Sequence, residues 1–384
     1  MKIGILTLPF NNNYGGYLQA YALMTVLKKM GHDVELIYRR PKRRPLKYRI
    51  LNPIKTVIKI LLGMPHCGFI MNQETDLRRD GKLLMPFVDK NIVPRTKPFY
   101  TTASMKKSCA GKYDTIIVGS DQVWRPKYLP NIYDFFLEFV EDKNVKKIAY
   151  AASFGTSTPE YTEEQKLKCG HLISSFSAIS VRENSGLDVI RSFGWKTNSI
   201  PQLVLDPTFL LERDKYFEYL LLDESNNIFC YILDKDEKNT ELIKLAEQIL
   251  HTSSFEIMKD SMSKSFCQPS IETWLSCIYN SKFVLTDSFH GMVFSIIFNK
   301  PFAVCVNHNR GADRFRSLLF QLNLESRIIN SKKELETIIN KSICWNEVNK
   351  KLQAMRLTSL HFLTESLKFV TTQHPYRKLL VNKA

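Results

Sequence analysis

Residues 2–38 read KIGILTLPFNNNYGGYLQAYALMTVLKKMGHDVELIY, and their pattern decides the fold class of this chain. An apolar run of strand length at Lys2–Leu8 is followed by a segment of helical period at Tyr17–Met30. A second strand-length run, Val34–Tyr38, comes after a Gly31-His32 turn. A strand, a helix and a strand in this order predict parallel strands joined by a crossover helix, as at the start of nucleotide-binding domains.

The same alternation recurs in two series along the rest of the 384 residues. In the first series the predicted strands are 113–118, 147–152, 177–181 and 199–205, with helices near 163–175 and 185–193. In the second series the predicted strands are 228–233, 255–258, 283–286 and 302–306, with helices at 239–250, 271–280, 292–298 and 312–322. Such alternation predicts an α/β protein with parallel sheets.

Two series of this length predict two Rossmann-like domains that face each other across a cleft. We expect an N-terminal domain over 1–210, a C-terminal domain over 211–345 and a helical tail over 346–384. The tail is expected to reach back onto the first domain. Residues from about 39 to 110 are basic and irregular, and they form an insertion within the first domain.

The amino-acid composition indicates which kinds of molecule this protein can bind. The net charge is +16, from 54 Lys and Arg against 38 Asp and Glu, which favours nucleic acid, an acidic membrane surface or a phosphorylated substrate. The standard nucleic-acid-binding motifs are absent from the sequence, so no nucleic acid is expected. Eight cysteines include no CxxC pair, which favours reduced thiols. Without a secretory signal pattern or a bilayer-length apolar run, the expected location is the cytoplasm.

The segment Arg39–Leu62 stands out because residues 39–59 hold nine Lys or Arg and no acidic residue. Its apolar side chains fall on one face of a helix expected from Pro53, and they are Ile50, Ile54, Val57, Ile58 and Leu61. A basic segment with one apolar face is typical of a peripheral anchor on anionic lipid. The alternative is a solvated basic loop with a short helix packed on the core.

Ligands of parallel sheets bind beyond the carboxyl ends of the strands, and the unusual residues of this sequence lie there. In the first such loop, NNNYGGYLQA, Gly15 and Gly16 allow a tight turn and a close approach. Asn13, Tyr14 and Gln19 offer hydrogen bonds. We consider these five residues as contacts for an acceptor substrate, with plain turn chemistry as the alternative.

The loop after DTIIV is the second candidate. It places Ser120 and Asp121 at the rim of the sheet, followed by Gln122 and Trp124. Asp121 is a candidate to orient an acceptor hydroxyl, and Gln122 and Trp124 are candidates to contact the acceptor. The alternative is a helix N-cap by Ser120 or Asp121.

Two further strands end in candidates for binding an anion. AYAASFG ends at Ser153 and Gly155, and AISVREN places Arg182 directly after a strand. An arginine at this position can hold phosphate or carboxylate through two hydrogen bonds. The alternative for Arg182 is an ion pair with Glu183 or another carboxylate at the rim.

The strongest candidate is TDSFHGMVFSIIFNKPF, where a strand runs into a helix dense in apolar residues. His290 lies at the start of that helix beside Ser288, Gly291 and Met292. Backbone N–H groups and the helix dipole at such a start can hold an anion next to the imidazole. Further along the chain, Arg314 is a secondary cationic candidate, as are His308 and Arg310.

The sequence contains no P-loop, no HExxH, no GxSxG and no paired Cys/His spacing. We therefore expect no metal and no redox cofactor. Cationic and amide groups with one histidine suit an anionic substrate that is activated by proton transfer.

The motifs NYGGYLQAYAL, IIVGSDQVW, AYAASFG, ISVRE, LDPTFLL and TDSFHGMVFSIIFNKPF occur here in the order of the polysaccharide pyruvyl transferase family, which this chain resembles over roughly residues 1–330. The resemblance implies a GT-B-like fold. It also implies transfer of the enolpyruvyl carbons of phosphoenolpyruvate to two hydroxyls of one sugar, giving a cyclic ketal. His290 matches the family's catalytic histidine, and Arg182 matches an arginine that holds the donor. Ser288 stands where a well-studied branch has an arginine.

The expected function is thus pyruvylation of a sugar of a bacterial surface polysaccharide, capsule or exopolysaccharide, or of its lipid-linked precursor. Phosphoenolpyruvate would be a co-substrate. A peripheral position at the inner face of the plasma membrane would follow from Arg39–Leu62. Two rivals remain open on the sequence: a GT-B glycosyltransferase that uses a nucleotide-sugar, and a non-catalytic protein that binds anions or lipid surfaces.

Overall fold

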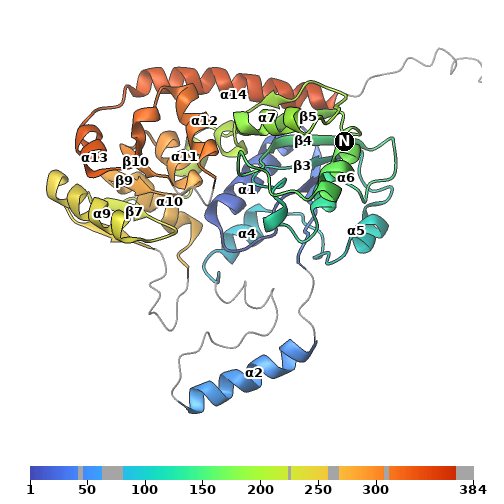
Figure 1. Ribbon diagram of the computed structural model, residues 1–384, viewed down its shortest axis with the longest axis horizontal. Coiled ribbons are helices and arrows are strands. Elements are labelled where there is room, and N and C mark those ends of the chain that lie inside the picture. The colour runs from blue at the N-terminus through green and yellow to red at the C-terminus, as the bar shows by residue number, and fades with distance from the viewer. Residues whose placement is uncertain (42–45, 63–80, 224–225, 258–267, 307–310, 369–384) are drawn as a thin grey trace, which may run out of the picture.

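The computed structural model describes residues 1–41, 46–62, 81–223, 226–257, 268–306 and 311–368. Its described part contains two parallel β-sheets covered by helices (Figure 1). The first sheet has the order β2-β1-β3-β4-β5-β6. Its strands are β1 (Lys2–Leu6), β2 (Asp33–Leu36), β3 (Thr115–Val118), β4 (Lys146–Ala152), β5 (Ala178–Val181) and β6 (Gln202–Leu203).

The second sheet has the order β11-β10-β9-β7-β8, also in parallel. Its strands are β7 (Ile228–Tyr231), β8 (Ser254–Glu256), β9 (Phe283–Thr286), β10 (Phe302–Cys305) and β11 (Ile328–Ile329). In both sheets the chain first pairs a strand on one side of the opening strand and then crosses to the other side. The strand order therefore reverses at β1/β3 and at β7/β9, and such points are where ligands bind in open α/β sheets.

The helices of the first unit are α1 (Tyr14–Lys29), α2 (Leu46–Leu61), α4 (Met85–Asn91), α5 (Thr102–Cys109), α6 (Glu163–Ile173) and α7 (Asn184–Ser192). Those that follow are α8 (Asp214–Phe217), α9 (Glu237–Leu250), α10 (Ile271–Asn280), α11 (Phe289–Ile297), α12 (Asp313–Leu322), α13 (Lys332–Ile339) and α14 (Trp345–Leu367). None of the described helices combines the length and the apolarity needed to cross a bilayer.

The strand and helix series predicted from the sequence agree with these elements, including β9 and α10 to the residue. Two helices begin three residues earlier than predicted because a side chain caps each start. Asn13 accepts the Gly16 N–H at the start of α1, and Ser288 accepts the Gly291 N–H at the start of α11. The insertion expected to be irregular contains α2, α4 and α5.

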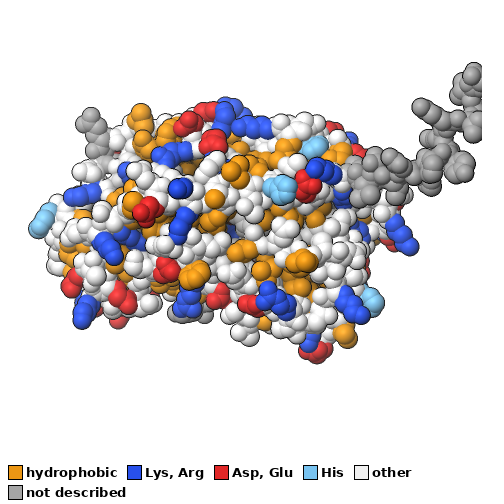
Figure 2. All heavy atoms as spheres, turned by 90° about the horizontal axis from the view of Figure 1, so that it is seen from above, with side chains coloured by type: hydrophobic (Ala, Val, Ile, Leu, Met, Phe, Trp, Pro, Cys, Tyr) orange, Lys and Arg blue, Asp and Glu red, His pale blue; other side chains and the backbone are white. Residues whose placement is uncertain are grey.

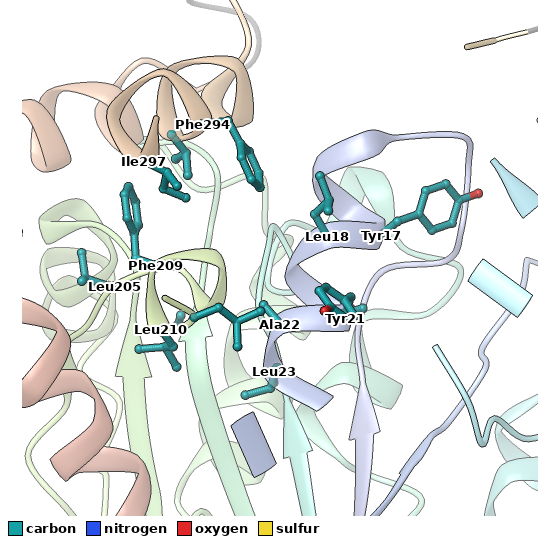
Figure 3. Packing of buried hydrophobic residues seen from close by; sticks show 14 of the residues in the cluster. Tyr17, Leu18, Tyr21, Ala22, Leu23, Leu205, Phe209, Leu210, Phe294 and Ile297 are labelled. Atoms are coloured by element: carbon teal, nitrogen blue, oxygen red, sulfur yellow. The ribbon is translucent and has the colours of Figure 1, made fainter. Parts of the chain in front are cut away.

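One hydrophobic core joins the two sheet units. Figure 3 shows Leu18 and Ala22 of α1 near Phe209 of the 3₁₀ turn Pro207–Leu210 and near Phe294 of α11, and all of them are buried. Every residue of α11 is buried, as expected for a helix that is apolar all round. This continuous core holds the carboxyl ends of both sheets close together.

The long helix α14 returns to the first sheet, as predicted, and Figure 1 shows it lying across both units. Ser359 of α14 accepts the Leu205 N–H at 3.0 Å, and Arg356 Nε donates to Phe209 O at 2.7 Å. Lys146 of β4 donates to Ser366 O at 3.1 Å. The helix therefore fixes the segment that follows β6, which carries a residue of the site.

Candidate active site

The charged residues at the carboxyl ends of the strands meet where the two units face each other. Asp121 follows β3, Arg182 follows β5 and Asp206 follows β6, and Arg314 comes from α12 of the second unit. We call these four residues the Arg–Asp cluster. His290, in the first turn of α11, lies beside it with Nε2 3.6 Å from Asp206 Oδ2.

Asp206 is held by hydrogen bonds to both of its carboxylate oxygens. Its Oδ2 accepts hydrogen bonds from Arg182 at 2.6 Å and from Ser120 Oγ at 3.2 Å. Its Oδ1 accepts the backbone N–H and the hydroxyl of Thr208 at 3.1 and 2.8 Å. The carboxylate is fully enclosed, so these donors replace its water. It is held rigidly beside the imidazole of His290.

Both carboxyl groups of the cluster favour the ionised form. Burial by itself would raise the pKa of Asp206, but the neighbouring His290 imidazole and Arg182 guanidinium outweigh it and hold that pKa below its usual value. The same balance, with burial opposed first by Arg182, lowers the pKa of Asp121. Asp121 also has φ +76°, a conformation that non-glycine residues rarely adopt and that clusters at functional sites.

Both terminal nitrogens of the Arg182 guanidinium donate hydrogen bonds within the protein in this structure. One of its terminal nitrogens donates to Asp206 and the other to Asp121 Oδ1 at 3.1 Å. The ion-pair alternative describes Arg182 in this structure, with Asp121 and Asp206 as its partners, and direct binding of an anion by Arg182 stays a prediction. Arg182 therefore organises the two carboxylates, and its charge is balanced by them.

Arg314 supplies the second cation. Its guanidinium carbon lies 5.2 Å from the centre of the Phe289 ring, and that of Arg182 lies 4.5 Å from the same centre. Burial and the charge of Arg182 lower the pKa of Arg314 to about 10, so it remains protonated at neutral pH. Because these two effects disfavour its charged form, an anion bound nearby would stabilise it.

The imidazole of His290 packs directly on α1 of the first unit. A Cβ atom built on Gly15 would lie 1.9 Å from His290 Nδ1 and 2.1 Å from Cγ. Only glycine at position 15 leaves room for the imidazole. His290 is thus held between the start of α1 and Asp206, and within the described part of the chain its Nε2 has no hydrogen bond.

The start of α11 does not offer the amides that were expected to receive an anion. The Gly291 N–H donates to Ser288 Oγ at 3.3 Å, and the Met292 N–H donates to Ser288 O at 3.0 Å. In this structure Ser288, Gly291 and Met292 form the start of the helix, and anion binding by them stays a prediction. A Cβ on Gly291 would lie 2.5 Å from Thr286 Oγ1, so this glycine lets the helix approach β9.

The loop after β4 packs against the second unit. Ser153 Oγ accepts the Gly155 N–H at 3.0 Å, so this hydroxyl shapes the loop. A Cβ built on Gly311 would lie 1.7 Å from Gly155 O, which places the two backbones in direct contact. Asp313 of α12 accepts the Ser157 N–H at 3.0 Å. The two units are closed on each other at this loop.

Three of the residues expected to contact an acceptor are structural. Trp124 is fully buried, donates to Phe135 O at 3.1 Å and stacks on Phe136. Tyr14 is buried and stacks on Trp274 of the second unit with ring centres 5.0 Å apart. Gln19 accepts the Ser120 N–H at 3.1 Å and so fixes the turn after β3. These contacts give the three residues a structural role, and acceptor contact by them stays a prediction.

The remaining candidates from the first two loops are Asn13, Gly16 and Gln122, and each has a different environment. Asn13 caps α1, and a Cβ on Gly16 would meet only Asn13 atoms, at 3.7 Å or more. Gln122 is buried and accepts a hydrogen bond from Arg125 at 3.1 Å, close to Gly155. None of these contacts places an acceptor. The candidates His308 and Arg310 lie outside the described residues.

Sequence reasoning missed Asp206 as a site residue, and it considered Glu183 only as a possible ion-pair partner of Arg182. Asp206 lies just beyond a strand within LDPTFLL, so its position at a strand end was the available signal. Glu183 is buried, and its Oε1 accepts the Phe154 N–H at 3.0 Å. Its Oε2 has no hydrogen-bond partner among the described residues. Burial raises the pKa of Glu183, although Arg182 and Arg314 oppose the shift.

Solved structures with a similar fold include two sugar-nucleotide epimerases. The UDP-GlcNAc 2-epimerase from Methanocaldococcus jannaschii has a TM-score of 0.52 and 12% identity, over 94% of this chain and all of that one (100%). The UDP-GlcNAc 2-epimerase from Neisseria meningitidis, bound to UDP-GlcNAc, has a TM-score of 0.52 and 10% identity over 96% and 99% of the two chains. At such identities the likeness shows the fold alone, a GT-B-like pair of α/β domains.

Sequence comparison is more specific. General stress protein 30 of Bacillus subtilis (strain 168) is 26% identical over 230 residues, which are 55% of this chain and 65% of that protein. The chain thus matches less than two thirds of that relative's length. The family model described as polysaccharide pyruvyl transferase matches residues 13–309. That range includes well over half of the 384 residues and nearly all of the site described above, and on this ground the chain belongs to the polysaccharide pyruvyl transferase family.

Proposed function

We propose that this protein transfers the pyruvyl group of phosphoenolpyruvate to a sugar of a bacterial surface polysaccharide, such as a capsule or exopolysaccharide, or to its lipid-linked precursor. One hydroxyl of the sugar adds across the double bond of phosphoenolpyruvate: its oxygen bonds to the central carbon, and the methylene carbon gains a proton and becomes a methyl group. The proton released by the hydroxyl replaces the one that was delivered. A second hydroxyl then displaces phosphate from the same carbon, and its proton leaves with the phosphate. The product is a cyclic pyruvate ketal.

The position of His290 carries this proposal. Its imidazole is pressed on Gly15 and lies 3.6 Å from the Asp206 carboxylate. The carboxylate stabilises an imidazolium, so His290 can hold the proton that the methylene carbon needs. An ionised Asp206, with its pKa held low, can stabilise that imidazolium throughout the reaction.

Arg314 is the proposed contact for the donor's negative charge. The well-studied branch of the family has an arginine two residues before the catalytic histidine, where this chain has Ser288. Here the Arg314 guanidinium lies over the ring of Phe289, the residue between Ser288 and His290. The guanidinium of Arg314, from α12, can therefore replace the arginine that this chain lacks at position 288. Because α12 belongs to the second unit, Arg314 brings this charge to the site from across the interface between the two units.

The test follows phosphate release from phosphoenolpyruvate in the presence of candidate acceptors, together with the mass of the acceptor. Wild-type protein should release phosphate and add a pyruvate ketal. His290→Ala should lose about 10²–10⁴-fold in rate, the usual loss for removing an acid or base. His171→Ala, which changes an exposed histidine of α6, is the matched control and should keep full activity. Arg314→Gln should mainly raise the KM for phosphoenolpyruvate.

Two results would contradict the proposal. If His290→Ala kept its rate with its fold intact, the imidazole would have no part in the chemistry. If the protein released a nucleotide from a nucleotide-sugar and no phosphate from phosphoenolpyruvate, it would be a glycosyltransferase. The same assay therefore distinguishes the two GT-B-type activities.

We also propose that the acceptor is carried on a lipid and that the enzyme works in the cytoplasm at the inner face of the plasma membrane. The basic segment Arg39–Leu62 and the net charge of +16 support this location. Activity on an acceptor in vesicles should then exceed activity on the same sugar without its lipid.

A further inference from the structure

Helix α2 carries the densest group of exposed large apolar side chains among the described residues. Six of them lie within twelve residues, with exposed fractions from 43% to 78%: Leu51, Ile54, Val57, Ile58, Leu61 and Leu62. Figure 1 shows α2 apart from the two sheet units. Elsewhere among the described residues the exposed large apolar side chains lie singly, as Leu167, Phe320 and Leu357 do, or in the smaller group Phe217, Leu221 and Leu222. Scattered apolar residues need no explanation, whereas a group of them marks an interaction surface.

These six side chains form one continuous face. At 100° per residue they span an arc of about 140° around the helix axis, from Val57 to Leu62. The exposed Lys55 and Lys59 follow next around the helix, just beyond Leu62. Residues 46–62 contain four Lys or Arg and no Asp or Glu. The helix therefore has an apolar face bordered by positive charge.

Two arginines at the start of the basic segment do not belong to this surface. Arg39 is buried in an ion pair with Asp134 at 2.7 Å, and the buried Arg40 donates to Phe10 O at 2.6 Å. They attach the segment to the first unit. On the face that carries α14, Figure 2 shows Lys and Arg interspersed with acidic and apolar side chains. That face therefore mixes its charges, whereas α2 has exposed lysines beside a group of exposed apolar side chains.

We propose that α2 lies flat on an anionic lipid bilayer, with its apolar face in the headgroup region and Lys55 and Lys59 at the phosphates. An apolar face bordered by lysines matches this surface in both polarity and charge. Nucleic acid would use the charge and leave the apolar face exposed to water. The inference names the partner of this helix and does not depend on the donor chemistry proposed above.

The experiment sediments the full chain with vesicles of phosphatidylglycerol and phosphatidylcholine, and with vesicles of phosphatidylcholine alone. Binding should require the anionic lipid and should weaken as salt rises. Ile54→Glu/Ile58→Glu should reduce the partition constant by at least tenfold. Lys55→Glu/Lys59→Glu should also reduce it, because each lysine contributes on the order of five-fold near an anionic surface. Leu167→Glu/Leu357→Glu, which changes exposed leucines on α6 and α14, is the matched control and should bind as wild type does.

Several results would overturn this inference. Wild-type protein that stayed in the supernatant with anionic vesicles would refute it, as would isoleucine variants that bound normally. A change of oligomeric state in Ile54→Glu/Ile58→Glu would identify a second copy as the partner. Competition by RNA with unchanged binding of the isoleucine variants would identify nucleic acid. Phosphate release with a lipid-free acceptor should be the same in all these variants, so a failure here is distinguishable from a failure of the proposed reaction.

Discussion

The contact between Gly15 and His290 allows a substitution that changes no ionisable residue to test the site. In Gly15→Ala the new Cβ would lie 1.9 Å from His290 Nδ1, whereas ordinary contacts begin at 3.4 Å. The imidazole or the helix start must therefore move by about 1.5 Å, the difference between those two distances. A misplacement of about 1 Å at a reacting group can cost on the order of 10²-fold in rate.

We expect Gly15→Ala to lower kcat by about 10²-fold or more. Overpacking of this kind costs about 1–3 kcal/mol of folding free energy, so the protein should remain folded. The matched control is Gly16→Ala in the same helical turn, where the nearest atom to a new Cβ is Asn13 Cβ at 3.7 Å. That variant should keep its activity. It should gain up to about 1 kcal/mol, because alanine is favoured over glycine within helices.

The assay is phosphate release from phosphoenolpyruvate with acceptor, measured beside urea unfolding of each variant. Gly15→Ala should also be tested in a His290→Ala background. With the imidazole removed there is no clash, so the second substitution should cost neither activity nor stability, and the two effects should be strongly non-additive. Full activity in Gly15→Ala, or additive losses in the double variant, would refute the assignment of His290 to this contact.

Two buried carboxyl groups should contribute to folding stability with opposite dependence on pH. The pKa of Asp206 is lowered in the folded state, so its stabilisation is present at neutral pH and is lost as pH falls below about 4, the unfolded value. Asp206→Asn should therefore cost about 3–5 kcal/mol at pH 7, and urea midpoints should show this difference shrinking in acid; a constant difference would contradict it. Burial raises the pKa of Glu183, so its contribution is full below about 4.3 and falls as pH rises. Glu183→Gln should therefore be more stable relative to wild type at pH 8 than at pH 4, and thermal unfolding curves with equal pH dependence would exclude this.

The local sequence pattern was sufficient to predict most of the helices and strands. Strand-length apolar runs and helical periods located β9 and α10 to the residue, because these signals depend on neighbours along the chain. The starts of α1 and α11 were misplaced since a cap depends on the side-chain geometry of Asn13 and Ser288. The helices α4 and α5 lie in a stretch without clear periodicity, and tertiary packing of Met85, Phe87 and Met105 stabilises them.

The sequence indicated where in the fold polar residues would gather, but it did not indicate which of them would contact each other. Polar residues after strands were expected to converge, and Asp121, Arg182 and His290 do lie together with Arg314. The partners of each group could not be read from the chain. Arg182 was expected to face a ligand and instead holds two carboxylates, one of them 24 residues away along the chain.

The sequence by itself determined the α/β class, the two parallel sheets and the edge at which functional groups gather, because strand period and chain direction are local properties. Only the tertiary structure decided which of those groups are neutralised, which pack in the core and which press against the other unit. Trp124 and Tyr14 are core residues, and Gly15 packs against the imidazole of His290. Burial and charge pairing depend on atoms that are distant in the chain, and only the folded arrangement of both units brings those atoms together.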